Sequence, residues 1–177
     1  MKSIMLFTFG LILCFGIQAQ SQVRLPVFYK GCGIIFTEKS KVNVSLDLGE
    51  FFEPSVEDIK KSEEILYENL EDYLEIKFSR VREEYPLTKN DINKWKKTID
   101  NADAKKLYRR YNRQYAGFIN EAGDKLVYMR LINFKSPKQS KKYFENWKEE
   151  IVVGFGDFYE ENTRVFVINI DRNEIIR

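Results

Sequence analysis

The chain has 177 residues, of which 44% are hydrophobic and 32% are charged, which suits one folded core and excludes a disordered or fibrous protein. The 29 Lys and Arg nearly balance the 27 Asp and Glu, and the resulting net charge of +2 does not predict strong binding to nucleic acid. Histidine is absent, which excludes histidine-based catalytic triads and imidazole metal sites.

The first 22 residues have the three-part layout of a secretory signal peptide. Lys2 precedes the apolar run Ile4–Ile17, and polar residues follow from Gln18. This run is shorter than the roughly 20 apolar residues that a membrane-spanning helix needs. We therefore predict cleavage after Ala19 or after Ser21, and a periplasmic or extracellular location. Cleavage after Ala19 gives a signal peptide at 1–19 and a single α+β domain at 20–177.

The two cysteines predict a protein with neither a lipid anchor nor a disulfide bond. The bacterial lipid-attachment motif has a small residue before its cysteine, whereas Leu13 precedes Cys14. Once the signal peptide is removed, Cys32 has no partner for an intramolecular disulfide, so packing alone must stabilise the fold. Because no histidine is present to activate a thiolate, we interpret Cys32 as a small apolar residue at the entry to a strand over 34–36.

Strict alternation of apolar and polar residues predicts a strand over 42–48, which Gly49 ends. A helix is predicted next, over 56–72, because Ser55 and Asp58 stand at capping positions before an apolar series with helical spacing. The following apolar residues alternate, so they either extend this helix or begin a strand; they are Leu74, Ile76 and Phe78.

Tyr85–Pro86 interrupts the chain, and Thr88 or Asp91 is predicted to cap a second helix. The apolar residues of this helix are Ile92, Trp95 and Ile99, and an apolar stripe continues beyond them through Leu107, Tyr108 and Tyr111.

The last third of the chain predicts a β-sheet. Residues 114–119 and 125–134 are rich in β-branched and aromatic residues, and the loop between them contains Gly123, which predicts a β-hairpin. Residues 126–132 are apolar on both faces apart from Arg130, as expected of a central strand covered on both sides. A short helix or turn is predicted within 140–150, and further strands at 151–153 and 164–170. The predicted fold class is therefore α+β, with a mainly antiparallel sheet of four to six strands and one long helix packed on it.

Charge is segregated along the chain, with acidic residues concentrated at 57–75 and basic residues at 94–113. Two helix faces that complement each other within the molecule would explain this pattern. The alternative is a surface for an acidic partner, which we take to be an anionic glycan, a lipid headgroup or an acidic protein. The candidate ligand-binding residues of this surface are Lys105, Lys106, Arg109, Arg110 and Arg113.

An enzyme without histidine would depend on carboxylates, as glycosidases do. The candidates are Asp157, Glu160 and Glu161, although solvated turn residues explain the same cluster without catalysis. We interpret Gly154–Asp157 as a turn or β-bulge between strands, because no helix is predicted after it to complete a phosphate-binding loop. No catalytic residue is assigned, and neither a cofactor nor a metal site is predicted.

Three segments together resemble a group of uncharacterised small secreted proteins of Bacteroides-type and flavobacterial organisms. They are Pro54–Ile59, Arg113–Phe118 and Asn146–Lys148, and the resemblance covers roughly residues 50–170. It implies export and an α+β sheet with a helix on it, and it implies no activity. Such proteins often have Asp-Gly-Gly in the loop where this chain has Gly154–Asp157, so no functional residue is carried over.

These observations together predict an exported, non-enzymatic binding or interaction module whose ligand the sequence does not identify. The alternative is a carboxylate-dependent, glycosidase-like hydrolase that acts on an envelope or host polymer. No nucleic-acid partner is expected, and the sequence does not indicate an oligomeric state.

Overall fold

The structure, a computed structural model, describes residues 22–23, 33–44, 46–134 and 136–177. Its helices are α1 (Val56–Glu84), α2 (Lys89–Asp100), α3 (Ala104–Arg110), α4 (Pro137–Tyr143) and α5 (Asp157–Asn162), with a short 3₁₀ helix at Lys39–Lys41. Its strands are β1 (Gln22–Val23), β2 (Gly33–Ile35), β3 (Glu50–Phe52), β4 (Tyr111–Ile119), β5 (Lys125–Asn133), β6 (Thr163–Asn169) and β7 (Glu174–Ile175). The predicted signal peptide and both cysteines lie outside the described residues.

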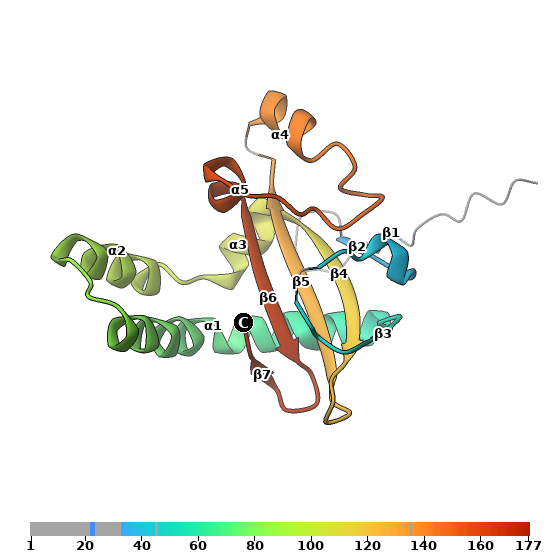
Figure 1. Ribbon diagram of the computed structural model, residues 1–177, viewed down its shortest axis with the longest axis horizontal. Helices are drawn as coiled ribbons and strands as arrows, with labels where there is room; N and C mark the ends of the chain where they lie inside the picture. Colours follow the sequence, from blue (N-terminus) through green and yellow to red (C-terminus); the bar gives the residue numbers. More distant parts are fainter. Residues whose placement is uncertain (1–21, 24–32, 45, 135) are drawn as a thin grey trace, which may run out of the picture.

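The described strands form one sheet in the order β1–β2–β4–β5–β6–β7, and β3 also pairs with β4. Their pairings are antiparallel except for the parallel pair of β2 and β4. Figure 1 shows the three long strands β4, β5 and β6 at the centre of this sheet, with α1 lying across its back. The predicted α+β fold, with a mainly antiparallel sheet and a long helix packed on it, is confirmed.

The predicted hairpin is formed by β4 and β5, which pair from Tyr111 opposite Asn133 to Ile119 opposite Lys125. Gly123 in its loop has a φ of +83°, a conformation that glycine adopts without steric cost. Gly117 on β4 allows β3 to come close, because a Cβ at this position would lie 2.6 Å from the carbonyl oxygen of Phe52. Since β5 lies between β4 and β6, the prediction of a central strand is also confirmed.

The long helix α1 begins where the sequence predicts, at a capping box formed by Ser55 and Asp58. Its buried residues pack against one face of the sheet, and they include Ile59, Leu66 and Leu70. The helix has 29 residues and continues well beyond residue 72, because no helix-breaking residue occurs before Pro86. The alternation over Leu74–Phe78 therefore belongs to the helix and not to a strand.

The outer part of α1 and the whole of α2 form a helical arm, which we define as residues 75–100. Thr88 caps α2 in a second capping box with Asp91, and α2 then returns alongside α1. The rings of Phe78 and Trp95 stack between the two helices, with centroids 5.6 Å apart. Figure 1 shows that the arm projects past the β6 side of the sheet into solvent.

The sheet face opposite α1 is covered by chain that is not part of the sheet. The strand predicted over 42–48 is wrong, because the described residues of this segment form no strand. The alternation nevertheless has a physical cause, since the apolar side chains lie half-buried on the sheet face; they are Val42, Val44, Leu46 and Leu48. The described residues of this segment therefore bury one side without pairing their backbone with a neighbouring strand.

The connection from β5 to β6 covers the same face further along. The strand predicted at 151–153 is also wrong, because Ile151 and Val152 are buried in a loop. The interpretation of Gly154–Asp157 as a turn between strands needs correction too, since the six-residue helix α5 begins at Asp157. Asp157, Glu160 and Glu161 are all exposed on α5.

Among the described residues, no helix is both long enough and apolar enough to cross a membrane.

Candidate functional site

The candidate ligand-binding residues divide into two groups in the structure. Lys105, Lys106, Arg109 and Arg110 are exposed on α3, the short helix between the arm and β4. Arg113 lies on β4, is fully buried and therefore does not belong to this surface. Whether the four exposed residues bind an acidic partner stays a prediction.

Arg113 is instead part of a buried cluster beneath α1. Its Nε lies 3.3 Å from Oε1 of Glu63, and its Nη1 donates to the carbonyl oxygen of Tyr108 at 3.2 Å. The Tyr115 hydroxyl donates to the same Glu63 oxygen, while the Tyr108 hydroxyl donates to the Glu63 carbonyl oxygen. Burial raises the pKa of Glu63 to about 7, although the Arg113 charge and the Tyr115 hydrogen bond oppose this rise.

Internal charge complementarity explains only a small part of the charge segregation. Between the described residues of the acidic and basic segments, Glu63 and Arg113 make the only ion pair. Lys105 lies instead over the ring of Tyr67, with Nζ 5.0 Å from the centroid. The four exposed cations of α3 therefore make no ion pair with a carboxylate of α1, although Glu68 and Glu71 line the same surface pocket as Lys105.

A cleft of about 420 Å³ lies where the helical arm meets the sheet. Its walls come from α1, from the end of α2 and its connection to α3, from α3 itself, and from β4 and β6. The residues that line it are Leu70, Leu74, Thr98, Asn101, Ala102, Asp103, Lys106, Leu107, Arg110, Tyr111, Arg164 and Phe166. This volume lies within the range of small-molecule binding sites in proteins.

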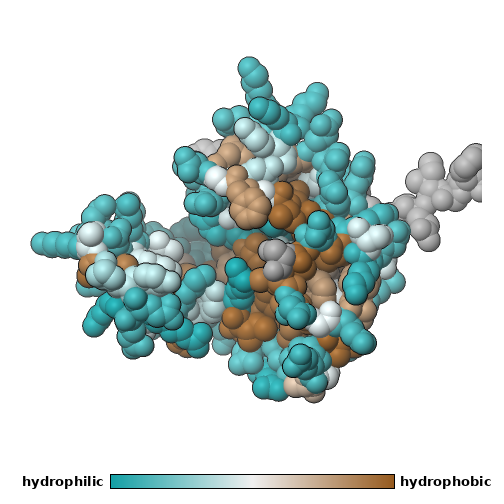
Figure 2. Space-filling view, in the orientation of Figure 1, coloured by the Kyte–Doolittle hydropathy of each residue, from teal (hydrophilic) through white to brown (hydrophobic). Residues whose placement is uncertain are grey.

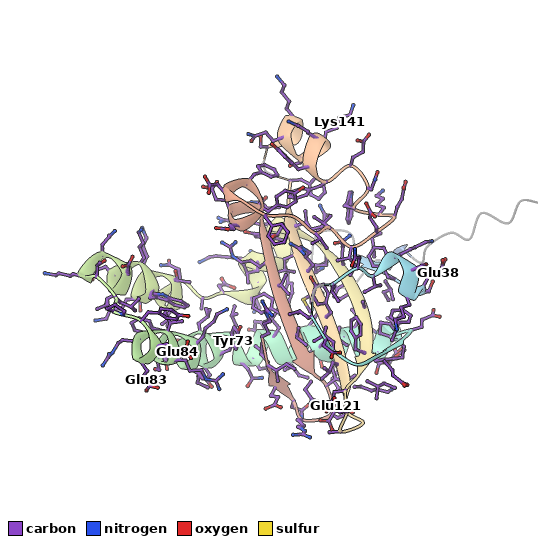
Figure 3. All side chains as sticks on the ribbon, viewed as in Figure 1. Glu38, Tyr73, Glu83, Glu84, Glu121 and Lys141 are labelled. Carbon is purple, nitrogen blue, oxygen red and sulfur yellow. The ribbon has the colours of Figure 1, made fainter. Side chains whose placement is uncertain are left out.

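The floor of the cleft is apolar and already well packed. Leu70 and Phe166 are 4% and 6% exposed, and Leu74 and Leu107 are half-buried above them. Tyr73 on α1 holds Phe166 in place from outside the cleft, with ring centroids 6.2 Å apart. Figure 3 shows Tyr73 beside the sheet, whereas Glu83 and Glu84 lie towards the outer end of the arm.

The rim of the cleft is positively charged. Three of its lining residues are cationic, namely Lys106, Arg110 and Arg164, and Asp103 is the single carboxylate among them. Asp103 accepts a hydrogen bond from the Lys106 backbone N–H at 3.1 Å and so caps α3, and it lies 3.7 Å from Lys106 Nζ. The cleft therefore combines an apolar floor with an excess of positive charge.

Arg164 is the cationic residue of this cleft that the sequence analysis did not select. Its Nη1 donates to the carbonyl oxygens of Glu160 and Thr163, at 2.6 and 2.7 Å, which fixes the guanidinium near the start of β6. The alternation of side chains along β6 could have identified Arg164 from the sequence, because Arg164 shares a sheet face with the buried residues Phe166 and Ile168. A cation on the apolar side of a strand end indicates a site more specifically than net charge does.

Comparisons of the chain with protein-family models, with curated proteins and with solved structures found no match. The resemblance to small secreted proteins therefore stays a prediction.

Proposed function

We propose that this chain is an exported, non-enzymatic binding module whose cleft takes a single-chain amphipathic anion, such as a fatty acid. The observation that carries the proposal is the meeting of an apolar floor with three cationic side chains in one cleft. The carboxylate would lie among Lys106, Arg110 and Arg164, and the aliphatic chain would cover Leu74 and Leu107. The signal-like layout of residues 1–19 supports export.

The apolar floor favours a lipid-like anion over the other two acidic partners considered. An anionic glycan or an acidic protein segment would satisfy the cations, but it would leave Leu74 and Leu107 exposed to water. An aliphatic chain removes this apolar surface from water at roughly 25 cal/mol per Å². Binding then depends on charge at the rim and on chain length at the floor, and these two dependences can be measured separately.

Isothermal titration of the mature chain with decanoate tests the proposal. We expect saturable binding that weakens as the salt concentration rises, because exposed charges are screened by salt. The double variant Lys106→Gln/Arg110→Gln should weaken binding about tenfold, since two exposed charge interactions are lost. Acetate, which carries the charge without the chain, should show no measurable binding.

The matched control is the double variant Lys105→Gln/Arg109→Gln, which removes the same charge from the same helix but outside the cleft. This control should bind decanoate like the parent chain. If both double variants weaken binding equally, the anion is attracted by the general charge of α3 and not by the cleft. Binding that is independent of salt would contradict the proposed role of the cations.

A further inference from the structure

A second cavity lies on the sheet face opposite α1, away from the cleft. It has a volume of about 140 Å³, and its lining includes Tyr128, Arg130, Val153, Phe155, Val165 and Arg177. Tyr128 and Arg130 belong to β5 and point to the same side, because they are two residues apart. Arg130 is the single polar interruption in the apolar strand 126–132, and the proposed function does not use it.

The guanidinium of Arg130 is buried without an anionic partner among the described residues. Arg130 is 8% exposed, and it makes none of the ion pairs between described residues. Its Nη1 donates to the Tyr128 hydroxyl and its Nη2 to the Thr163 hydroxyl, each at 3.3 Å. Its Nε is buried and has no hydrogen-bond acceptor in the described part of the chain. A buried cationic N–H of this kind favours an anionic acceptor.

The mouth of this cavity is apolar and open to solvent. Phe155 is 90% exposed and Val153 is 43% exposed, although both are large apolar side chains. Figure 2 shows apolar side chains gathered over the middle of this face of the molecule. Arg177 adds a second positive charge to the lining. A ligand that fits must therefore carry one negative group for Arg130 and a short apolar part for the mouth.

We propose that this cavity binds a small aliphatic monocarboxylate, whose carboxylate pairs with the guanidinium of Arg130. The Tyr128 hydroxyl is a second donor for the same carboxylate, and Arg177 contributes positive charge. The short aliphatic chain lies against Val153, Phe155 and Val165. Because the volume is about one third of that of the cleft, a short chain fits here and a long chain does not.

Amide chemical shifts in the NMR spectrum of the mature chain, recorded during titration with pentanoate, test this site. We expect saturable shifts at Arg130, Val153 and Phe155. Pentanamide has the same chain and no charge, and it should cause no comparable shifts at equal concentration. Arg130→Gln should weaken pentanoate binding at least about tenfold, because a charge-assisted hydrogen bond is lost.

Two further variants test the proposed pentanoate site even if Arg130→Gln does not fold. Phe155→Ala changes a side chain that is almost fully exposed, so the core is unaffected while the apolar contact with pentanoate is lost. Arg177→Gln removes the second charge, and Arg109→Gln removes an equal charge from α3 as the control. The proposal requires weaker pentanoate binding in the first two variants and unchanged binding in the control.

Equal shifts with pentanamide would overturn the proposal, and so would unchanged binding in either Phe155→Ala or Arg177→Gln. Shifts confined to cleft residues such as Leu107 and Arg110 would also overturn it. The test does not depend on the proposed function, because its reporting signals come from β5 and residues 153–155. Decanoate can fail to bind in the cleft while pentanoate still binds here, and the converse holds as well.

Discussion

Glu63 is a carboxylate within the core whose pKa links the stability of the fold to pH. Its side chain is 2% exposed, and burial raises its pKa from 4.5 to about 7. The folded chain therefore binds more protons than the unfolded chain between these two pH values. The free energy of unfolding consequently falls as the pH rises through this window, and this contribution is level above it.

The variant Glu63→Gln tests this linkage. Its carboxamide oxygen still accepts a hydrogen bond from Tyr115, but the group no longer titrates. The parent chain should lose about 3 kcal/mol of unfolding free energy between pH 4.5 and pH 7, whereas the variant should lose little. Chemical unfolding at a series of pH values across this window measures both slopes.

Glu64→Gln is the matched control, because Glu64 is the next residue of α1 and is exposed. It should keep the pH dependence of the parent chain. If Glu63→Gln also keeps that dependence, the slope arises elsewhere in the molecule and the assignment to Glu63 is wrong.

Gln114 is a buried side chain on β4 that holds a loop against the sheet through hydrogen bonds. Its Nε2 donates to the carbonyl oxygens of Trp147 and Glu150, and its Oε1 accepts from the backbone N–H of Val152 at 2.9 Å. One side chain on β4 thus satisfies three backbone groups of residues 147–152. This is why the segment can lie buried on the sheet without being a strand.

At the scale of elements, replacing Gln114 should release residues 147–152 from the sheet. Gln114→Ala leaves the three backbone groups without these partners, which should cost about 3 kcal/mol of stability. The amide hydrogen of Val152 should exchange with solvent much faster in the variant, as hydrogen-exchange mass spectrometry or NMR can show. Gln139→Ala on the exposed surface of α4 is the control and should change neither quantity. Unchanged exchange at Val152 in Gln114→Ala would show that the segment is held by other contacts.

The elements that the sequence predicts well are those whose signals are local. Ser55 with Asp58, and Thr88 with Asp91, form capping boxes from residues three apart, so both helix starts follow from short spacings. The errors at 42–48 and 151–153 have the opposite cause. A strand needs a neighbouring backbone, and alternation or an apolar run shows which side chains are buried without showing what the backbone pairs with.

For the candidate site too, local sequence patterns do not show which distant residues become neighbours. Charge alone selects Lys106 and Arg110, which line the cleft, but it also selects Arg113, which is buried against Glu63. Arg113 differs from its neighbours because α3 ends at Arg110 and β4 then runs under α1, an arrangement that depends on residues distant in the sequence. Arg164 comes from the far end of the chain, so its place beside α3 could not be predicted from spacing.

At the scale of the whole molecule, the cleft lies at the junction of two parts that differ in packing. The sheet and the first half of α1 form a dense core, whereas α2 in the helical arm has no buried residue. The cleft lies between them, where the cationic rim and the half-buried Leu74 and Leu107 are open to solvent. This position accounts for an open cleft on a protein whose sheet faces are both largely covered.

The most direct test of the cleft is the location of the aliphatic chain of bound decanoate. Intermolecular nuclear Overhauser effects between decanoate and the methyl groups of a leucine- and valine-labelled sample measure this location. We predict contacts with the methyl groups of Leu70, Leu74 and Leu107, which line the cleft. Contacts confined to methyl groups elsewhere, such as those of Leu46 or Val153 on the opposite sheet face, would contradict the proposed function.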